Sequence, residues 1–156
     1  MIMLNLDYYG HSCFGLSDEK YFVLIDPFIS GNPMAAVKAE SLKPTHILVT
    51  HGHQDHLGDA VEIAKRTKAL LIAPNELAVY CGNKGVNAHG MNIGGSRDFE
   101  FGRVYMTNAL HSSSVIEGKD FIYAGNPCGF VIRMQGKVIY HAGDTGLRNR
   151  KDSPRK

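Results

Sequence analysis

Three histidines and one aspartate lie within six consecutive residues of this chain, in the order His51-Gly52-His53-Gln54-Asp55-His56. Imidazole nitrogens combined with carboxylate oxygens suit zinc, manganese or iron better than calcium or magnesium. In a tight loop, His51 and His53 can point at one ion while Asp55 and His56 turn toward a second. The competing interpretation is a solvated polar turn in which Asp55 caps the following helix. The spacing favours the metal site.

Two residues farther along the chain extend this candidate site. His111 follows an apolar β-rich run at residues 104–109, and Asp144 follows another at residues 137–141. Taken alone, His111 is equally well explained as a surface histidine, and Asp144 as a turn residue. Because α/β proteins place their sites at strand ends, we expect both side chains to converge on the first loop. The sequence therefore predicts a site for two metal ions.

Hydrophobic periodicity places the histidine-rich loop between a strand and a helix. Residues 45–50 form an apolar, β-branched run that is typical of a buried strand. Other strands are expected in the first half of the chain at residues 2–9, 13–16, 21–26 and 70–73. Helices are expected at residues 34–41, 58–67 and 74–81, the last with Gly82 just past its end.

The second half of the chain returns to β-structure. Strands are expected at residues 87–92, 97–101, 104–109, 129–134 and 137–141. Between the third and fourth of these, residues 111–128 are rich in serine and glycine and predict a long loop. Long loops in compact domains are usually functional or mobile. Together the elements indicate an α+β protein.

Length and composition limit the class of protein. With 156 residues, 44% of them hydrophobic, the chain fits one domain with a sizeable core. No apolar run approaches the length of a membrane span, and the N-terminus lacks the pattern of a signal peptide, so we expect a cytoplasmic protein without a membrane segment. Cys13, Cys81 and Cys128 are far apart and form no CxxC pair, which argues against a disulfide framework or a structural zinc site.

The charge is unevenly distributed along the chain. The net charge is +2, but five basic residues and one aspartate put +4 into residues 148–156, which leaves −2 for residues 1–147. The basic tail is short and has no interleaved aromatic residues. These features argue against nucleic acid as a partner.

Six motifs that follow one another along the chain resemble those of the metallo-β-lactamase fold superfamily. The sequence closely resembles one branch of that superfamily, the small metal-dependent hydrolases related to the ascorbate-6-phosphate lactonases. The six motifs are Gly10-His11-Ser12-Cys13-Phe14, the segments 25–33, 50–59 and 110–114, Gly125-Asn126-Pro127 and the segment 140–146. The resemblance covers residues 3–147. It implies an αβ/βα sandwich of two sheets with helices outside, formed by an incomplete domain at residues 1–147 and followed by the basic tail at 148–156.

The resemblance also implies roles for the candidate residues. His51, His53 and His111 would hold one ion, Asp55 and His56 a second, and Asp144 would bridge both. Up to two zinc or manganese ions per chain would then generate a hydroxide that attacks a lactone, a phosphodiester or a similar small ester.

Four further roles concern residues around the ligands. Asp55 would orient the hydroxide as the catalytic residue. Asp26 would support the metal loop, although a strand-end capping role is equally consistent with its position. His11 and His141 flank the motifs and would support or pack against the ligands rather than bind metal.

The end of the sequence departs from the family pattern. Members of the branch continue past the motif that corresponds to Gly143-Asp144-Thr145-Gly146, and a final histidine in that continuation completes their second metal site. In this chain, all eight histidines lie at or before His141. We therefore expect a truncated C-terminal part, a weaker second site, and exposed apolar surface that a homo-oligomer would cover. The alternatives to a hydrolase of small esters are a catalytically impaired metal-binding fragment that functions through assembly, and a phosphodiesterase or nuclease.

Overall fold

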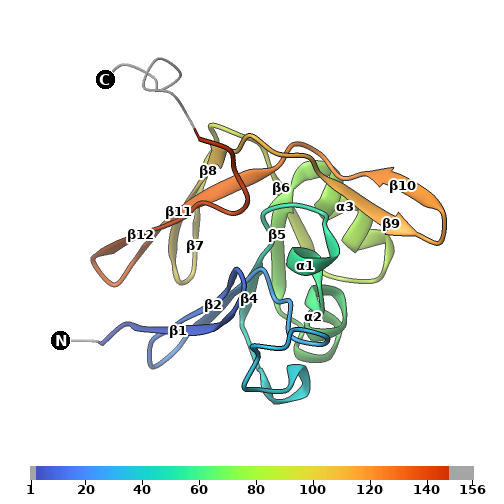
Figure 1. Cartoon of the computed structure of the whole chain (residues 1–156). Coiled ribbons are helices and arrows are strands. Elements are labelled where there is room, and N and C mark those ends of the chain that lie inside the picture. The colour runs from blue at the N-terminus through green and yellow to red at the C-terminus, as the bar shows by residue number, and fades with distance from the viewer. Residues whose placement is uncertain (1–2, 148–156) are drawn as a thin grey trace.

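Two β-sheets pack face to face in the computed structural model, which describes residues 3–147 (Figure 1). One sheet contains, in spatial order, β1 (Asn5–Gly10), β2 (Cys13–Ser17), β3 (Phe22–Ile25), β4 (His46–Leu48), β5 (Leu70–Pro74) and β6 (Ala88–Met91). Its pairs are antiparallel from β1 to β3 and parallel from β3 to β6. The other sheet is antiparallel, with the order β12 (Lys137–His141), β11 (Cys128–Met134), β8 (Gly102–Asn108) and β7 (Ser96–Phe99). The predicted tail at 148–156 lies outside the described residues.

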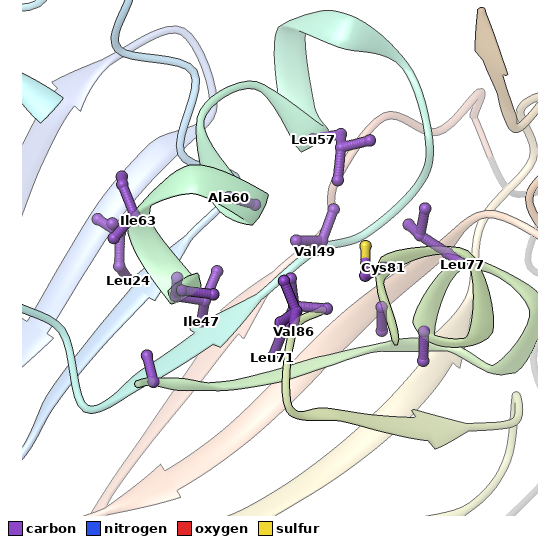
Figure 2. Packing of buried hydrophobic residues seen from close by; sticks show 14 of the residues in the cluster. Leu24, Ile47, Val49, Leu57, Ala60, Ile63, Leu71, Leu77, Cys81 and Val86 are labelled. Carbon is purple, nitrogen blue, oxygen red and sulfur yellow. The ribbon is translucent and has the colours of Figure 1, made fainter. Parts of the chain in front are cut away.

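Helices cover the face of the six-stranded sheet that points away from the other sheet. They are α1 (Gln54–Leu57), α2 (Ala60–Thr67), α3 (Asn75–Asn83) and the 3₁₀ turn η1 (Ala39–Ser41). In α2, Ala60, Ile63 and Ala64 recur at helical spacing and are buried. Figure 2 shows Ala60 and Ile63 among the buried residues of this core. This arrangement confirms the α+β class. Within residues 3–147, the four-stranded sheet carries no helix on its outer face.

Apart from His46, the central strands β4 and β5 are apolar because both of their faces are buried. Successive side chains of a strand point to opposite faces. Ile47 and Leu71 therefore pack under the helices (Figure 2), whereas Leu48 and Ile72 contact the other sheet. This double burial explains why β4 and β5 read as short continuous apolar runs.

Two predictions of secondary structure are wrong. The expected helix at residues 34–41 is only the 3₁₀ turn η1, because Lys38 is extended, with a φ of −97° and a ψ of 143°, and interrupts any longer helix. The expected loop at residues 111–128 contains a hairpin of β9 (Ser114–Glu117) and β10 (Asp120–Tyr123). Gly118, with a φ of 62°, supplies the left-handed conformation at its turn.

The end of α3 also differs from the prediction. The helix extends past Cys81 to Asn83, so Gly82 lies inside it rather than beyond it. The left-handed residue that follows the helix is Gly85, with a φ of 86°. Replacing Gly82 by a residue with a side chain should therefore change the stability of the helix.

We expect Gly82→Ala to raise the free energy of unfolding by about 0.5–1 kcal/mol, because alanine loses less backbone entropy in a helix than glycine. A methyl group at this exposed position meets no atom within 4 Å. Urea denaturation measures the change. Gly85→Ala is the matched control, since its site is equally open but its positive φ makes alanine strained. A lower denaturation midpoint for Gly82→Ala than for the wild type would contradict the prediction.

Apolar side chains are exposed on the edge strand of each sheet. Leu6 and Tyr8 lie on β1, and Val138 and Tyr140 lie on β12, all more than half exposed. Exposed apolar edges of this kind can pair with another chain. Homo-oligomerisation nevertheless stays a prediction. No helix within the described residues has the length and apolar character that a membrane span requires.

Candidate metal centre

The residues predicted to bind metal meet where several strands end. The segment 51–56, which runs into α1, follows β4, while His111 follows β8 and Asp144 follows β12. The potential ligand atoms form three groups, each with all of its atoms within 4.8 Å of one another. The groups are His51, His53 and His111; His11, Asp55 and His56; and His51, His56 and Asp144. All six residues predicted as ligands are therefore brought together, and His11 joins them.

Hydrogen bonds orient the first two histidines toward a common point. His51 Nδ1 lies 3.0 Å from Thr50 Oγ1, and His53 Nε2 lies 3.4 Å from Ser112 Oγ. The remaining nitrogens, His51 Nε2 and His53 Nδ1, face each other at 3.1 Å. Two atoms bound to one tetrahedral zinc ion at about 2.0–2.1 Å each lie about 3.3 Å apart. The spacing thus suits a shared cation.

The fourth imidazole of the cluster, that of His56, has one nitrogen occupied and one free. Its Nδ1 donates to Asp26 Oδ2 at 2.8 Å in a fully buried contact. Its Nε2 is buried without a hydrogen-bond partner, 3.3 Å from Asp144 Oδ1. A buried polar atom without a partner is costly, and an imidazole nitrogen left with its lone pair is a metal ligand. The donor set therefore fits a divalent ion.

The two oxygens of Asp144 face different histidines. Oδ1 is 3.3 Å from His56 Nε2, and Oδ2 is 3.7 Å from His111 Nε2. A carboxylate that spans two groups of ligands in this way has the geometry of a bridge between two ions. The bridging role itself stays a prediction.

The fully buried carboxylate of Asp26 positions residues of the centre by accepting hydrogen bonds from them. It accepts hydrogen bonds from the Thr50 amide at 2.8 Å, the Thr50 hydroxyl at 2.7 Å, His56 Nδ1 at 2.8 Å and His141 Nε2 at 3.1 Å. Burial alone would raise the pKa of Asp26, but the hydrogen bonds and the charges of His141 and His56 outweigh it and hold the pKa well below its usual range. Asp26 thus caps the strand end and also supports His56.

The environment favours the unprotonated form of His51 and His53 but the protonated form of His56. Burial, reinforced by the neighbouring His56, lowers the pKa of His51 to about 4. Burial, together with the nearby His111, also lowers the pKa of His53. The pKa of His56 is raised, because the hydrogen bond to Asp26 and its charge outweigh the opposing effect of burial. At neutral pH, His51 and His53 therefore carry lone pairs that can bind metal.

Two residues that sequence reasoning did not identify as part of the site contribute to it. Thr50 links Asp26 to His51, and Ser112 contacts His53. A hydroxyl residue directly before the histidine-rich loop is the signal that could have identified Thr50. The start of β9 and the residue after β10 also pack on this segment, where a Cβ at Gly52 would lie 2.9 Å from Ser114 O and 2.7 Å from Ala124 Cβ. Only glycine fits between the two first histidines.

The cysteines have no role in the centre. All three are free and buried. Burial raises the pKa of the Cys13 thiol, and that of Cys81, to about 12, and it also raises the pKa of Cys128. These thiols remain protonated at neutral pH and are poor nucleophiles.

Comparison with protein families finds one matching model. Residues 21–153 match the family described as the beta-lactamase superfamily domain. The chain is 57% identical over 145 residues to the UPF0173 metal-dependent hydrolase of Heliobacterium modesticaldum, covering 93% of this chain and 61% of that protein. It is 47% identical over 146 residues to the UPF0173 metal-dependent hydrolase YtkL of Bacillus subtilis, covering 92% and 64%. The chain thus spans less than two thirds of the length of these relatives.

A solved structure is similar over nearly the whole chain. Igni18, described as a novel metallo hydrolase from the hyperthermophilic archaeon Ignicoccus hospitalis, superposes with a TM-score of 0.79 at 36% sequence identity. The match covers 93% of this chain and 62% of Igni18. The shared fold therefore extends over most of this chain.

Proposed function

Because the chain belongs to the beta-lactamase superfamily, we propose that it acts as a metal-dependent hydrolase whose centre holds up to two divalent ions. His51, His53 and His111 hold the first ion, Asp55 and His56 hold the second, and Asp144 bridges both. When bound, such a pair of ions lowers the pKa of water and polarises the bond to be cleaved. The free, buried Nε2 of His56 is the observation that carries this proposal.

Asp55 acts as the catalytic residue in this proposal. Its side chain is 47% exposed, so it reaches solvent and an incoming substrate, whereas His51 and His56 are buried behind it. A carboxylate at this place orients the attacking water and accepts its proton. Asp26 and His141 do not contact substrate. They fix the ring of His56 and keep its Nε2 directed at the site.

The finer features of the proposal concern metal and substrate. We propose zinc or manganese as the metal, since both suit mixed imidazole and carboxylate donors. The substrate is a small molecule with a lactone, phosphodiester or similar ester, handled in the cytoplasm. The net charge of −2 in residues 1–147 disfavours a nucleic-acid substrate.

A second candidate function is assembly by a metal-binding but catalytically impaired chain. The exposed apolar residues of the edge strands β1 and β12 favour it. In that case the chain would hold a single weakly bound ion and form a homo-oligomer, which light scattering measures. A monodisperse monomer would exclude this candidate.

Metal content tests the hydrolase proposal directly. We expect the untagged protein to bind two equivalents of zinc or manganese per chain, measured by elemental mass spectrometry. Chelation should remove the hydrolysis of lactone or phosphodiester esters, and adding back the metal should restore it. Binding of no metal, or turnover that persists after complete chelation, would overturn the proposal.

A further inference from the structure

His11 lies apart from the histidine-rich loop in sequence but beside it in space. It occupies the turn between β1 and β2, and its Nε2 is 3.2 Å from Asp55 Oδ2. Its ring centre is 5.0 Å from that of His56. Within residues 3–147, the two histidines outside this region are His46, packed between Phe101 and Glu100, and His89 on β6.

The backbone holds His11 in a conformation that histidine rarely adopts. Its φ is 52°, in the left-handed region, directly after Gly10 with a φ of 98°. Neighbouring contacts fix this turn: the Tyr8 hydroxyl donates to the His11 carbonyl at 3.2 Å, and Gly10 packs closely on Asn32 and Met34. A strained residue that its surroundings keep in place points to a function for its side chain. Here the strain aims the imidazole at Asp55 and His56.

The geometry around His11 is that of ligands sharing an ion. One nitrogen of His11, one oxygen of Asp55 and one nitrogen of His56 all lie within 4.8 Å of one another. The 3.2 Å between His11 and Asp55 resembles the ligand spacing of about 3.3 Å expected around a tetrahedral ion. His56 contributes Nε2, because its Nδ1 is bound to Asp26. The His11 ring is 39% exposed, which leaves one side of the group open to solvent and substrate.

We propose that His11 Nε2 binds the same divalent ion as Asp55 and His56, and so acts as a protein ligand of the second metal site. This inference rests on the proposed function, since it concerns the second of the two ions. It changes the role expected from the sequence, in which His11 only supports the ligands. The β1–β2 turn then becomes part of the metal centre.

One other role for His11 must be separated from ligation. A hydrogen bond from His11 to Asp55 would orient that carboxylate without any contact to metal. Glutamine reaches about as far as histidine and keeps a donor for Asp55, but its neutral amide is a poor ligand for zinc. His11→Gly removes the side chain and suits the left-handed backbone, so it does not strain the turn.

The experiment measures zinc per chain after equilibrium dialysis, and the absorption spectrum of the cobalt-substituted protein, in both variants. We expect two equivalents in the wild type and one in His11→Gly and His11→Gln, with a dissociation constant for the second ion raised at least about tenfold. The cobalt bands of the second site should weaken in parallel. His89→Ala is the matched control for loss of an imidazole away from the centre, and it should retain two equivalents.

Each other result has a definite meaning. Two equivalents in His11→Gly would overturn the inference while leaving the hydrolase proposal intact. Two equivalents in His11→Gln but one in His11→Gly would also overturn it, because His11 would then act only by holding Asp55. Fewer than two equivalents in the wild type would count against the two-ion centre itself, before any variant is considered.

Discussion

Replacing Asp26 by alanine should lower the free energy of unfolding by about 3–5 kcal/mol, the range found when one partner of a buried charged pair is removed. The carboxylate is fully buried, and four donors converge on it. In the variant these donors lose their acceptor and stay buried. Urea denaturation of the metal-free protein measures the loss.

Asp26→Asn is the matched control for this change. Asparagine keeps the volume and tolerates the φ of 45° found at Asp26, so the backbone should remain unstrained. Its stability should lie between those of the wild type and Asp26→Ala. Both variants should also bind metal more weakly, because His56 loses the hydrogen bond that orients it. A loss of less than about 1 kcal/mol in Asp26→Ala would show that Asp26 does not organise the centre.

The contribution of Asp26 should also depend on pH. Because the folded-state pKa lies below the unfolded value of about 3.9, the stabilisation is complete above that value and is lost as the pH falls through the folded pKa. The gap in the free energy of unfolding between the wild type and Asp26→Asn should narrow below about pH 4 as Asp26 is protonated. It should also narrow as the pH rises through the folded-state pKa of His56, which the hydrogen bond to Asp26 and its charge raise. A gap that widens as the pH falls below about 4 would contradict the linkage to Asp26.

Replacing Asp55 by alanine should reduce kcat by about 10²–10⁴-fold, the usual range for loss of a general base. The side chain is nearly half exposed, and its carboxylate lies 3.2 Å from Nε2 of the partly exposed His11, so the fold should tolerate its removal. The ion at His51, His53 and His111 should remain. Steady-state kinetics with metal analysis on the same samples measures both effects.

Two variants make the Asp55 result specific. Asp55→Asn keeps an oxygen that can face an ion but cannot accept a proton, so its kcat should fall even where metal is retained. Asp120→Ala removes an exposed carboxylate at the start of β10 and should leave kcat unchanged. Turnover in Asp55→Ala at the wild-type level, with metal bound, would remove Asp55 from the mechanism.

Local sequence patterns were sufficient to predict the metal loop and the secondary-structure elements on either side of it. The apolar run of β4, the helical stripe of α2 and the strand β12 were predicted because burial imposes a period that is visible in a few residues. The α+β sandwich, which the resemblance to the superfamily implied, is also confirmed. His51, His53, Asp55 and His56 were recognisable because four potential ligands are adjacent in the chain.

Only the tertiary structure brought the other parts of the centre together. Asp26 binds residues that are 30 and 115 positions away, at His56 and His141, and no short spacing encodes such contacts. The hairpin β9–β10 was missed because its serine- and glycine-rich surroundings are typical of a loop, while packing against the metal loop stabilises it as strands. His11 was assigned a supporting role because its ring reaches Asp55 only through a left-handed turn. Side-chain types and short spacings are local properties of the sequence, whereas the direction of a strained turn and the partners of a buried charge depend on long-range packing.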